Sequence, residues 1–115
     1  MHKYQDIKIW SKGIDLVVDV YKVSAEFPKE EKYGLISQMR RCAVSIPSNI
    51  AEGAGRNSDK EFCHFLSVAN GSSYELETQV IVANRLELCE DLCQQLNEIQ
   101  KMNYSLQQRL TQTEK

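Results

Sequence analysis

The sequence contains no long apolar run, little proline and glycine, and only two histidines. A membrane-spanning helix needs about 20 apolar residues in a row, and no stretch of this chain approaches that length. The N-terminal residues 1–8 lack the apolar segment of a secretory signal, so we expect a cytoplasmic protein. With 115 residues, 42% of them apolar and 26% charged, the composition excludes fibrous and disordered classes. It predicts one globular domain over residues 1–115.

Recognisable reaction chemistry is also missing. His2 lies near the terminus and His64 stands alone after Cys63, with no HExxH motif and no paired carboxylates. We therefore expect a protein without enzymatic activity, with no catalytic residues, no cofactor and no metal site. We expect its four cysteines to be small buried hydrophobic residues, namely Cys42, Cys63, Cys89 and Cys93. The spacing of Cys89 and Cys93, four residues apart, leaves a thiol or metal switch open as an alternative.

Apolar residues recur at helical spacing in four segments, and no alternating pattern or hairpin dipeptide indicates a strand. The predicted fold class is therefore all-α, with helices at about residues 4–26, 33–53, 58–87 and 90–111. Short connections between four helices favour an antiparallel up-down-up-down bundle. In the first helix the apolar stripe consists of Ile7, Trp10, Ile14, Val17 and Tyr21.

The second predicted helix contains a proline within its apolar pattern. Pro47 has no N–H for the carbonyl of Ala43, so a helix that continues through it should bend. Gly53 and Gly55 stand where a helix end can use left-handed geometry, and Ser58 with Glu61 has the form of a capping box. These residues are interpreted as a structural motif together with Asn49 and Glu52.

One glycine and one asparagine interrupt the apolar patterns of the last two predicted helices. Gly71 interrupts the third helix, and we expect it to permit close approach of another backbone. The fourth helix has a heptad seam that serves the core or an oligomer interface, formed by Leu92, Leu96, Ile99, Asn103 and Leu106. Asn103 either specifies register or oligomer state or reaches solvent.

The net charge is −2, but residues 1–57 carry +2 and residues 58–115 carry −4, so a nucleic-acid surface is expected in the first half. Arg40 and Arg41 lie about 100° apart on a helix, so one should face the bundle and the other point outward. Arg56 and Lys60 flank a helix N-terminus that can hold an anion. The alternative for Arg40 and Arg41 is that they pair with carboxylates such as Glu52, Glu75 or Glu77, within or between subunits, and bind no ligand.

The chain resembles a family of small four-helix-bundle proteins encoded in intervening sequences of bacterial 23S rRNA genes. The resemblance covers nearly the whole chain. Its motifs are Phe27-Pro28 with Glu31, Tyr33-Gly34-Leu35 with Ser37-Gln38, Arg40-Arg41, Ser45-Ile46-Pro47, Asn49-Ile50-Ala51-Glu52-Gly53, Arg56, Phe62, Phe65-Leu66, Ala69, Gly71-Ser72 and Glu75-Leu76-Glu77.

This resemblance implies an antiparallel left-handed bundle in a ring-forming, pentameric assembly, with a function that is largely unassigned. A related branch resembles basic accessory proteins of diversity-generating retroelements, which work with a reverse transcriptase and its RNA, whereas this chain is acidic overall. We therefore carry two hypotheses: a homo-oligomer whose Arg40, Arg41, Arg56 and Lys60 contact structured RNA or an RNA-associated protein, and a protein-only scaffold that docks a partner through its acidic half.

Overall fold

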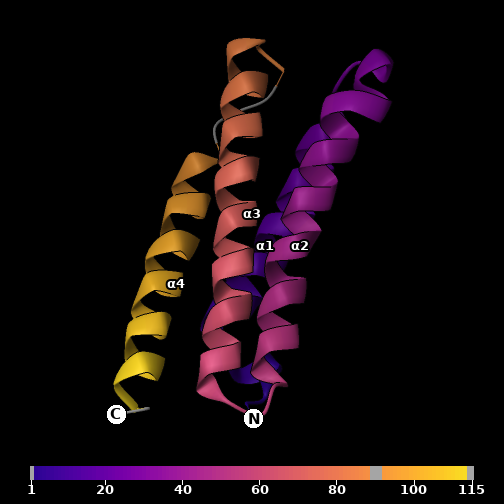
Figure 1. Cartoon of the computed structure of the whole chain (residues 1–115). Coiled ribbons are helices and arrows are strands. Elements are labelled where there is room, and N and C mark those ends of the chain that lie inside the picture. The colour runs from indigo at the N-terminus through magenta and orange to yellow at the C-terminus, as the bar shows by residue number, and fades with distance from the viewer. Residues whose placement is uncertain (1, 89–91, 114–115) are drawn as a thin grey trace.

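The computed structural model describes residues 2–88 and 92–113. Over this range the chain is helical and contains no strand, which confirms the all-α class. Four long helices lie side by side in an elongated body of 50 × 19 × 19 Å (Figure 1). They are α1 (Lys8–Ser24), α2 (Ser37–Ala54), α3 (Asp59–Arg85) and α4 (Cys93–Thr113), with short 3-10 turns at Tyr4–Asp6 and Lys29–Glu31 and a π-helical turn at Lys32–Ile36.

Cross-helix bonds show how the helices are arranged. The Cys42 thiol of α2 bonds to Glu75 of α3, and three residues further along α2 the hydroxyl of Ser45 bonds to Ser72. Because the residue numbers rise on α2 while they fall on α3, these two helices run in opposite directions. The amide of His2 donates to the carbonyl of Ala54, which places the start of the chain beside the end of α2. The four-helix bundle is confirmed, and its left-handed sense stays a prediction.

The core of α1 is not the stripe expected from the sequence. Trp10 and Val17 are only partly buried, and Ile14 and Tyr21 are exposed. A neighbouring stripe faces the core, consisting of Ile9, Gly13, Leu16, Val20 and Ser24. Both stripes have helical spacing, and the buried one is harder to recognise because it contains a glycine and a serine. The expected stripe forms an apolar outer face of α1.

The start of α1 also differs from the expectation. The predicted helix begins near Tyr4, but Ile7 is extended, with φ −89° and ψ 118°, and it separates the turn at Tyr4–Asp6 from the helix proper. This break lets the N-terminal residues fold back toward the end of α2, where the His2 amide bonds to Ala54.

Two glycine predictions are wrong for the connection between α2 and α3. Neither Gly53 nor Gly55 has a positive φ; Gly55 has φ −83°. Gly53 is instead required for packing, since a Cβ at this position would lie 2.7 Å from Cβ of Phe65. The N-cap role of Ser58 in the predicted capping box is confirmed, because Ser58 Oγ accepts a hydrogen bond of 3.1 Å from the amide of Glu61.

Among residues 2–88 and 92–113, the residue with a left-handed conformation is Glu87, with φ 60°, at the end of α3. The amides of Glu87 and Leu88 donate to the carbonyls of Asn84 and Ala83, which is the pattern of a Schellman motif. Glycine usually occupies this position. Its replacement by glutamate explains why the sequence marks the end of the third helix so poorly.

Pro47 lies inside α2, which continues through it. A Cβ on Gly13 would lie 3.3 Å from Cβ of Pro47, so the missing side chain of Gly13 lets α1 approach α2 at the proline. The expectation for Gly71 is wrong, because no atom lies within 4 Å of a Cβ built there. The bend at Pro47 stays a prediction.

Candidate functional sites

The two adjacent arginines of α2 point in different directions, as their helical spacing predicts. Arg40 faces α1, where its Nε donates to Ser24 Oγ at 2.8 Å and its Nη2 donates to the carbonyl of Tyr21 at 3.3 Å. Its guanidinium carbon also lies 4.5 Å from the centre of the Tyr21 ring. Ser24 is fully buried. Arg40 therefore connects α2 to α1, and a carboxylate is not its partner among the described residues.

Arg41 is exposed and donates to the side-chain oxygen of Gln38, one turn earlier on the same helix, at 2.9 Å. Within the described part of one chain, neither Arg40 nor Arg41 forms an ion pair with Glu52, Glu75 or Glu77, and pairing between subunits stays a prediction. Over the described ranges the ion pairs within 4 Å join His2 to Asp59, Lys12 to Glu98 and Arg56 to Glu52. Arg41 thus keeps its charge available to solvent.

Arg56 and Lys60 lie at the other end of α2, at the connection to α3. Arg56 Nη2 donates to Glu52 at 2.6 Å, and its guanidinium carbon lies 4.7 Å from the centre of the Phe65 ring. Lys60 is exposed on the first turn of α3. At 1.5 Å per helical residue, roughly 20 Å separates this pair from Arg40 and Arg41. The four basic residues do not form one site.

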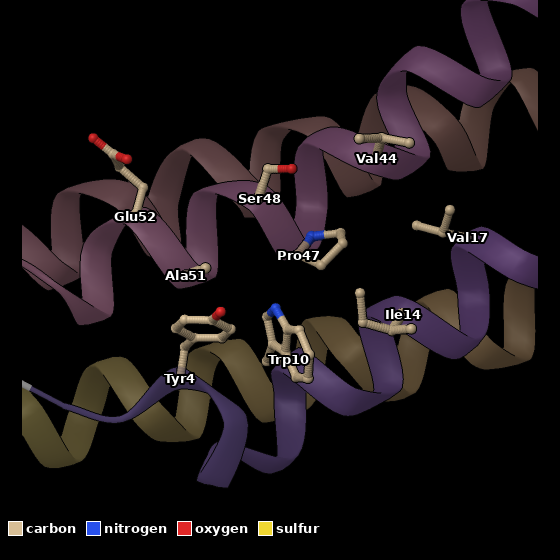
Figure 2. Close-up of a pocket in the computed structure, with 9 residues that line it drawn as sticks. All are labelled: Tyr4, Trp10, Ile14, Val17, Val44, Pro47, Ser48, Ala51 and Glu52. Carbon is tan, nitrogen blue, oxygen red and sulfur yellow. The ribbon is translucent and has the colours of Figure 1, made fainter.

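A groove of about 520 Å³ lies between α1 and α2 (Figure 2). Trp10, Ile14 and Val17 line it from α1, and Val44 and Pro47 line it from α2. Ile14 is 38% exposed and Val44 40% exposed, although both belong to helices that pack closely here. Figure 2 shows the Trp10 ring between the two helices, beside Pro47. The groove is therefore a mainly apolar surface with aromatic side chains on the outside of the bundle, and Ser48 and Glu52 also line it.

A row of polar contacts joins α2 to α3. The hydroxyls of Ser45 and Ser72 bond across the two helices at 2.8 Å, and Asn49 Nδ2 donates to the carbonyl of Ser45 at 2.8 Å. The Cys42 thiol donates to Glu75 Oε2 at 2.6 Å. Burial, followed by this bond to a carboxylate, raises the pKa of Cys42 to about 11. Cys42 is a protonated, buried donor and not a reactive thiolate.

Asn103 does not reach solvent. It is 1% exposed, and its Nδ2 donates to the carbonyl of Leu66 on α3 at 2.8 Å. Its Oδ1 accepts a hydrogen bond of 2.6 Å from Gln107 Nε2. The rest of the predicted seam faces the core, with Leu92, Leu96 and Ile99 buried and Leu106 partly buried. Because this seam packs inside one chain, it forms the core and leaves no free face for an oligomer.

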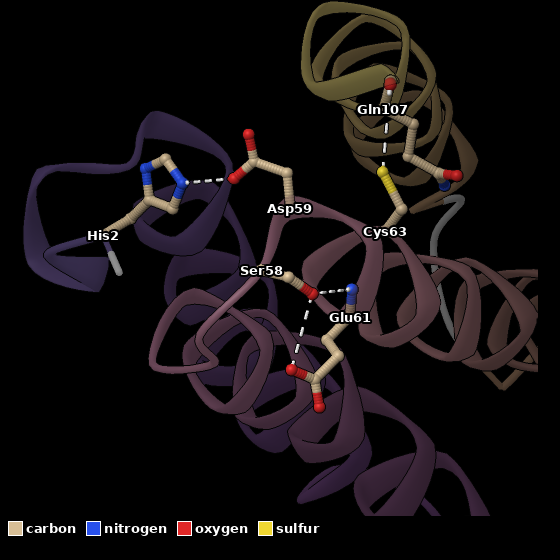
Figure 3. Close-up of polar contacts among 6 residues, drawn as sticks. All are labelled: His2, Ser58, Asp59, Glu61, Cys63 and Gln107. Atoms are coloured by element: carbon tan, nitrogen blue, oxygen red, sulfur yellow. Dashed lines mark hydrogen bonds and ion pairs between the residues drawn. The ribbon is translucent and has the colours of Figure 1, made fainter. Parts of the chain in front are cut away.

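Further polar contacts lie at the end of the bundle where α2 ends and α3 begins (Figure 3). His2 Nε2 lies 3.0 Å from Asp59 Oδ1, and the His2 ring packs 5.1 Å from the ring of Phe62. The Cys63 thiol donates to the carbonyl of Gln107 on α4 at 3.9 Å. These contacts fasten the N-terminal segment and α4 to the first turns of α3.

The described ranges do not bring metal-ligating residues together. There, no three His, Cys, Asp or Glu side chains are grouped in a way that could hold a metal ion. Cys89 lies outside the described residues, so the switch hypothesis for Cys89 and Cys93 is left as a prediction. None of the described helices is long and apolar enough to cross a membrane.

The fold and these surfaces define a small four-helix-bundle protein with an apolar outer groove. The family model of the 23S rRNA-intervening sequence protein matches residues 5–111, and the chain belongs to that family. No curated protein matches the chain.

Proposed function

We propose that this protein is a non-enzymatic cytoplasmic scaffold that assembles into a homo-oligomer, favoured to be a pentamer, through the α1–α2 groove. The observation that carries the proposal is the cluster of Trp10, Ile14, Val17 and Val44 around one outer groove. Single exposed apolar residues are ordinary, but a contiguous patch with an aromatic anchor is typical of an interface.

A closed ring of five subunits requires a heterologous interface, in which the groove of one subunit receives a different surface of the next. The exposed apolar residues of α3 supply such a surface. Val68 and Val82 are exposed and lie on one face of α3, 14 residues apart, and the exposed Leu86 follows directly after the helix. This face is separate from the α1–α2 groove.

The test is light scattering coupled to size-exclusion chromatography, performed on the wild type and on Ile14→Glu. A pentamer has five times the 13.2 kDa mass of one chain. In the interface the new carboxylate would be buried without a partner, at a cost of about 3–5 kcal/mol, so the variant should dissociate while it remains helical. Val18→Glu is the matched control, because Val18 is on the same helix, is 45% exposed and lies outside this groove. A wild type that is monomeric at all concentrations would refute the proposal.

RNA contact through Arg41 and Lys60 is the second candidate, favoured by the exposure of both side chains and by the absence of an ion pair to either in the described ranges. Arg41→Glu should weaken binding of a structured ribosomal RNA fragment while the oligomer survives. Arg40→Glu should destabilise the bundle instead, since Arg40 bonds to Ser24 and Tyr21. No binding by the wild type at low salt, where phosphate contacts are strongest, would leave the protein-only scaffold.

A further inference from the structure

A second groove, of about 570 Å³, lies between α3 and α4 on a surface that neither candidate function uses. Its volume is in the range of small-molecule sites, which is about 300–1,000 Å³. Two tyrosines line it, Tyr74 from α3 and Tyr104 from α4, and they are 54% and 67% exposed. The remaining lining residues are polar or basic: Asn97, Gln100, Lys101 and Ser105.

One residue that lines the groove, Gln100, has an unsatisfied hydrogen-bond donor, which a rotation of its side chain would present to a ligand. Gln100 Nε2 is buried and has no acceptor within the described part of the chain. Buried polar groups in folded proteins are nearly always paired, so an unpaired donor beside a groove is a reason to look for a ligand acceptor. Asn97 adds a second amide to the same lining. Two amides and two exposed aromatic rings are suited to a planar ligand with hydrogen-bonding edges.

Lys101 is the charged residue that lines this groove, although the chain as a whole is negative. On α4 the basic residues are Lys101 and Arg109, and the acidic residue is Glu98, which pairs with Lys12 of α1 at 3.2 Å. Lys101 also lines an adjacent groove between α1 and α4, together with Lys8 and Arg109. Asp6 is the acidic residue of that adjacent groove, and no carboxylate lines the α3–α4 groove. An anionic group is therefore favoured next to the tyrosines.

We infer that the α3–α4 groove binds an unpaired nucleobase, with Tyr104 and Tyr74 as stacking surfaces, the amides of Gln100 and Asn97 at the base edge, and Lys101 at the phosphate. Aromatic side chains next to a basic rim are the general means by which proteins hold single-stranded nucleic acid. The inference goes beyond the RNA candidate above, because it assigns nucleic-acid contact to a surface that contains neither Arg41 nor Lys60. A free nucleotide offers the same chemistry as a nucleotide within a strand.

The test measures fluorescence anisotropy of a labelled single-stranded oligonucleotide of about 12 residues, a length within the range of known single-strand sites. Tyr104→Ala should weaken binding roughly 5- to 150-fold, as expected for loss of one stacked base. Tyr104→Phe should retain binding because the ring remains. Lys101→Ala should lower the slope of log affinity against log salt concentration by about one, as expected for the loss of one phosphate contact. Adenosine monophosphate as a competitor distinguishes a free nucleotide from a strand.

Three results would overturn the inference: no binding of the oligonucleotide by the wild type at low salt, equal binding by Tyr104→Ala, or equal affinity for a duplex of the same sequence. Loss of binding in Arg41→Glu without loss in Tyr104→Ala would also overturn it, and would place the contact on α2. Light scattering on the same variants keeps the result separate from the scaffold proposal, since Tyr104 lies outside the α1–α2 groove.

Discussion

Asn103→Asp replaces a buried amide with a group of the same shape that carries charge at neutral pH. The Asn103 amide nitrogen lies 2.8 Å from the carbonyl oxygen of Leu66, so an ionised carboxylate there would place two oxygens against each other in the core. A buried charge without a partner costs about 3–5 kcal/mol. We therefore expect the free energy of unfolding to fall by about this amount near pH 7.

The same substitution should be far less harmful in acid. A protonated carboxyl can donate to Leu66 and accept from Gln107, which restores both bonds of Asn103. An unperturbed Asp has a pKa of about 3.9, and each unit by which the folded state raises it costs about 1.4 kcal/mol at neutral pH. A cost of 3 kcal/mol thus corresponds to a folded-state pKa near 6. Because the pKa is raised on folding, the penalty is absent below about pH 4 and grows up to about pH 6.

The assay is urea unfolding followed by circular dichroism near pH 4 and pH 7, at one chain concentration because oligomerisation adds to the apparent stability. Asn97→Asp is the control, since Asn97 is on the same helix and is exposed. It should change the free energy of unfolding by no more than about 0.5 kcal/mol at either pH. Equal losses in the two variants, or a loss for Asn103→Asp that does not depend on pH, would refute the reasoning.

The remaining predictions concern glycines and a thiol. Gly53→Ala should destabilise the fold by about 1–3 kcal/mol in thermal unfolding, because its Cβ would lie 2.7 Å from Phe65. Gly71→Ala should stabilise it by up to about 1 kcal/mol, since no atom lies within 4 Å, and a loss of stability would contradict this packing. Cys42 should resist alkylation near pH 8, well below its pKa of about 11, and peptide mass spectrometry that finds it labelled like an unfolded thiol would contradict its burial.

The helices could be predicted from the sequence because their apolar spacing and caps are local signals. The N-cap at Ser58 and the all-α class are examples. The buried face of α1 could not be predicted, because Gly13 and Ser24 belong to the core for reasons that depend on α2. Gly13 makes room for Pro47, and Ser24 accepts a bond from Arg40. Such partners are distant in sequence, so periodicity within one helix does not reveal them.

The glycine errors have a similar origin. Gly53 follows an apolar helix and precedes a capping box, which is the usual context of a left-handed helix end. The constraint on Gly53 comes instead from the ring of Phe65 across the turn, while a glutamate adopts the left-handed conformation after α3. A glycine can be required for its missing side chain or for its φ, and local sequence does not distinguish the two.

The net charge of each half of the chain does not indicate which basic residues are available to a ligand. Counting by halves directs attention to residues 1–57, where Arg40 and Arg56 prove to be engaged with Ser24 and Glu52. Helix α4, within the acidic half, carries Lys101 and Arg109 against one acidic residue, Glu98, and therefore has a net charge of +1. Only the fold adds Lys8 beside Lys101 and Tyr74 beside Tyr104. Because surface potential depends on neighbours within about 10 Å, the charge of one helix and its neighbours is the relevant quantity.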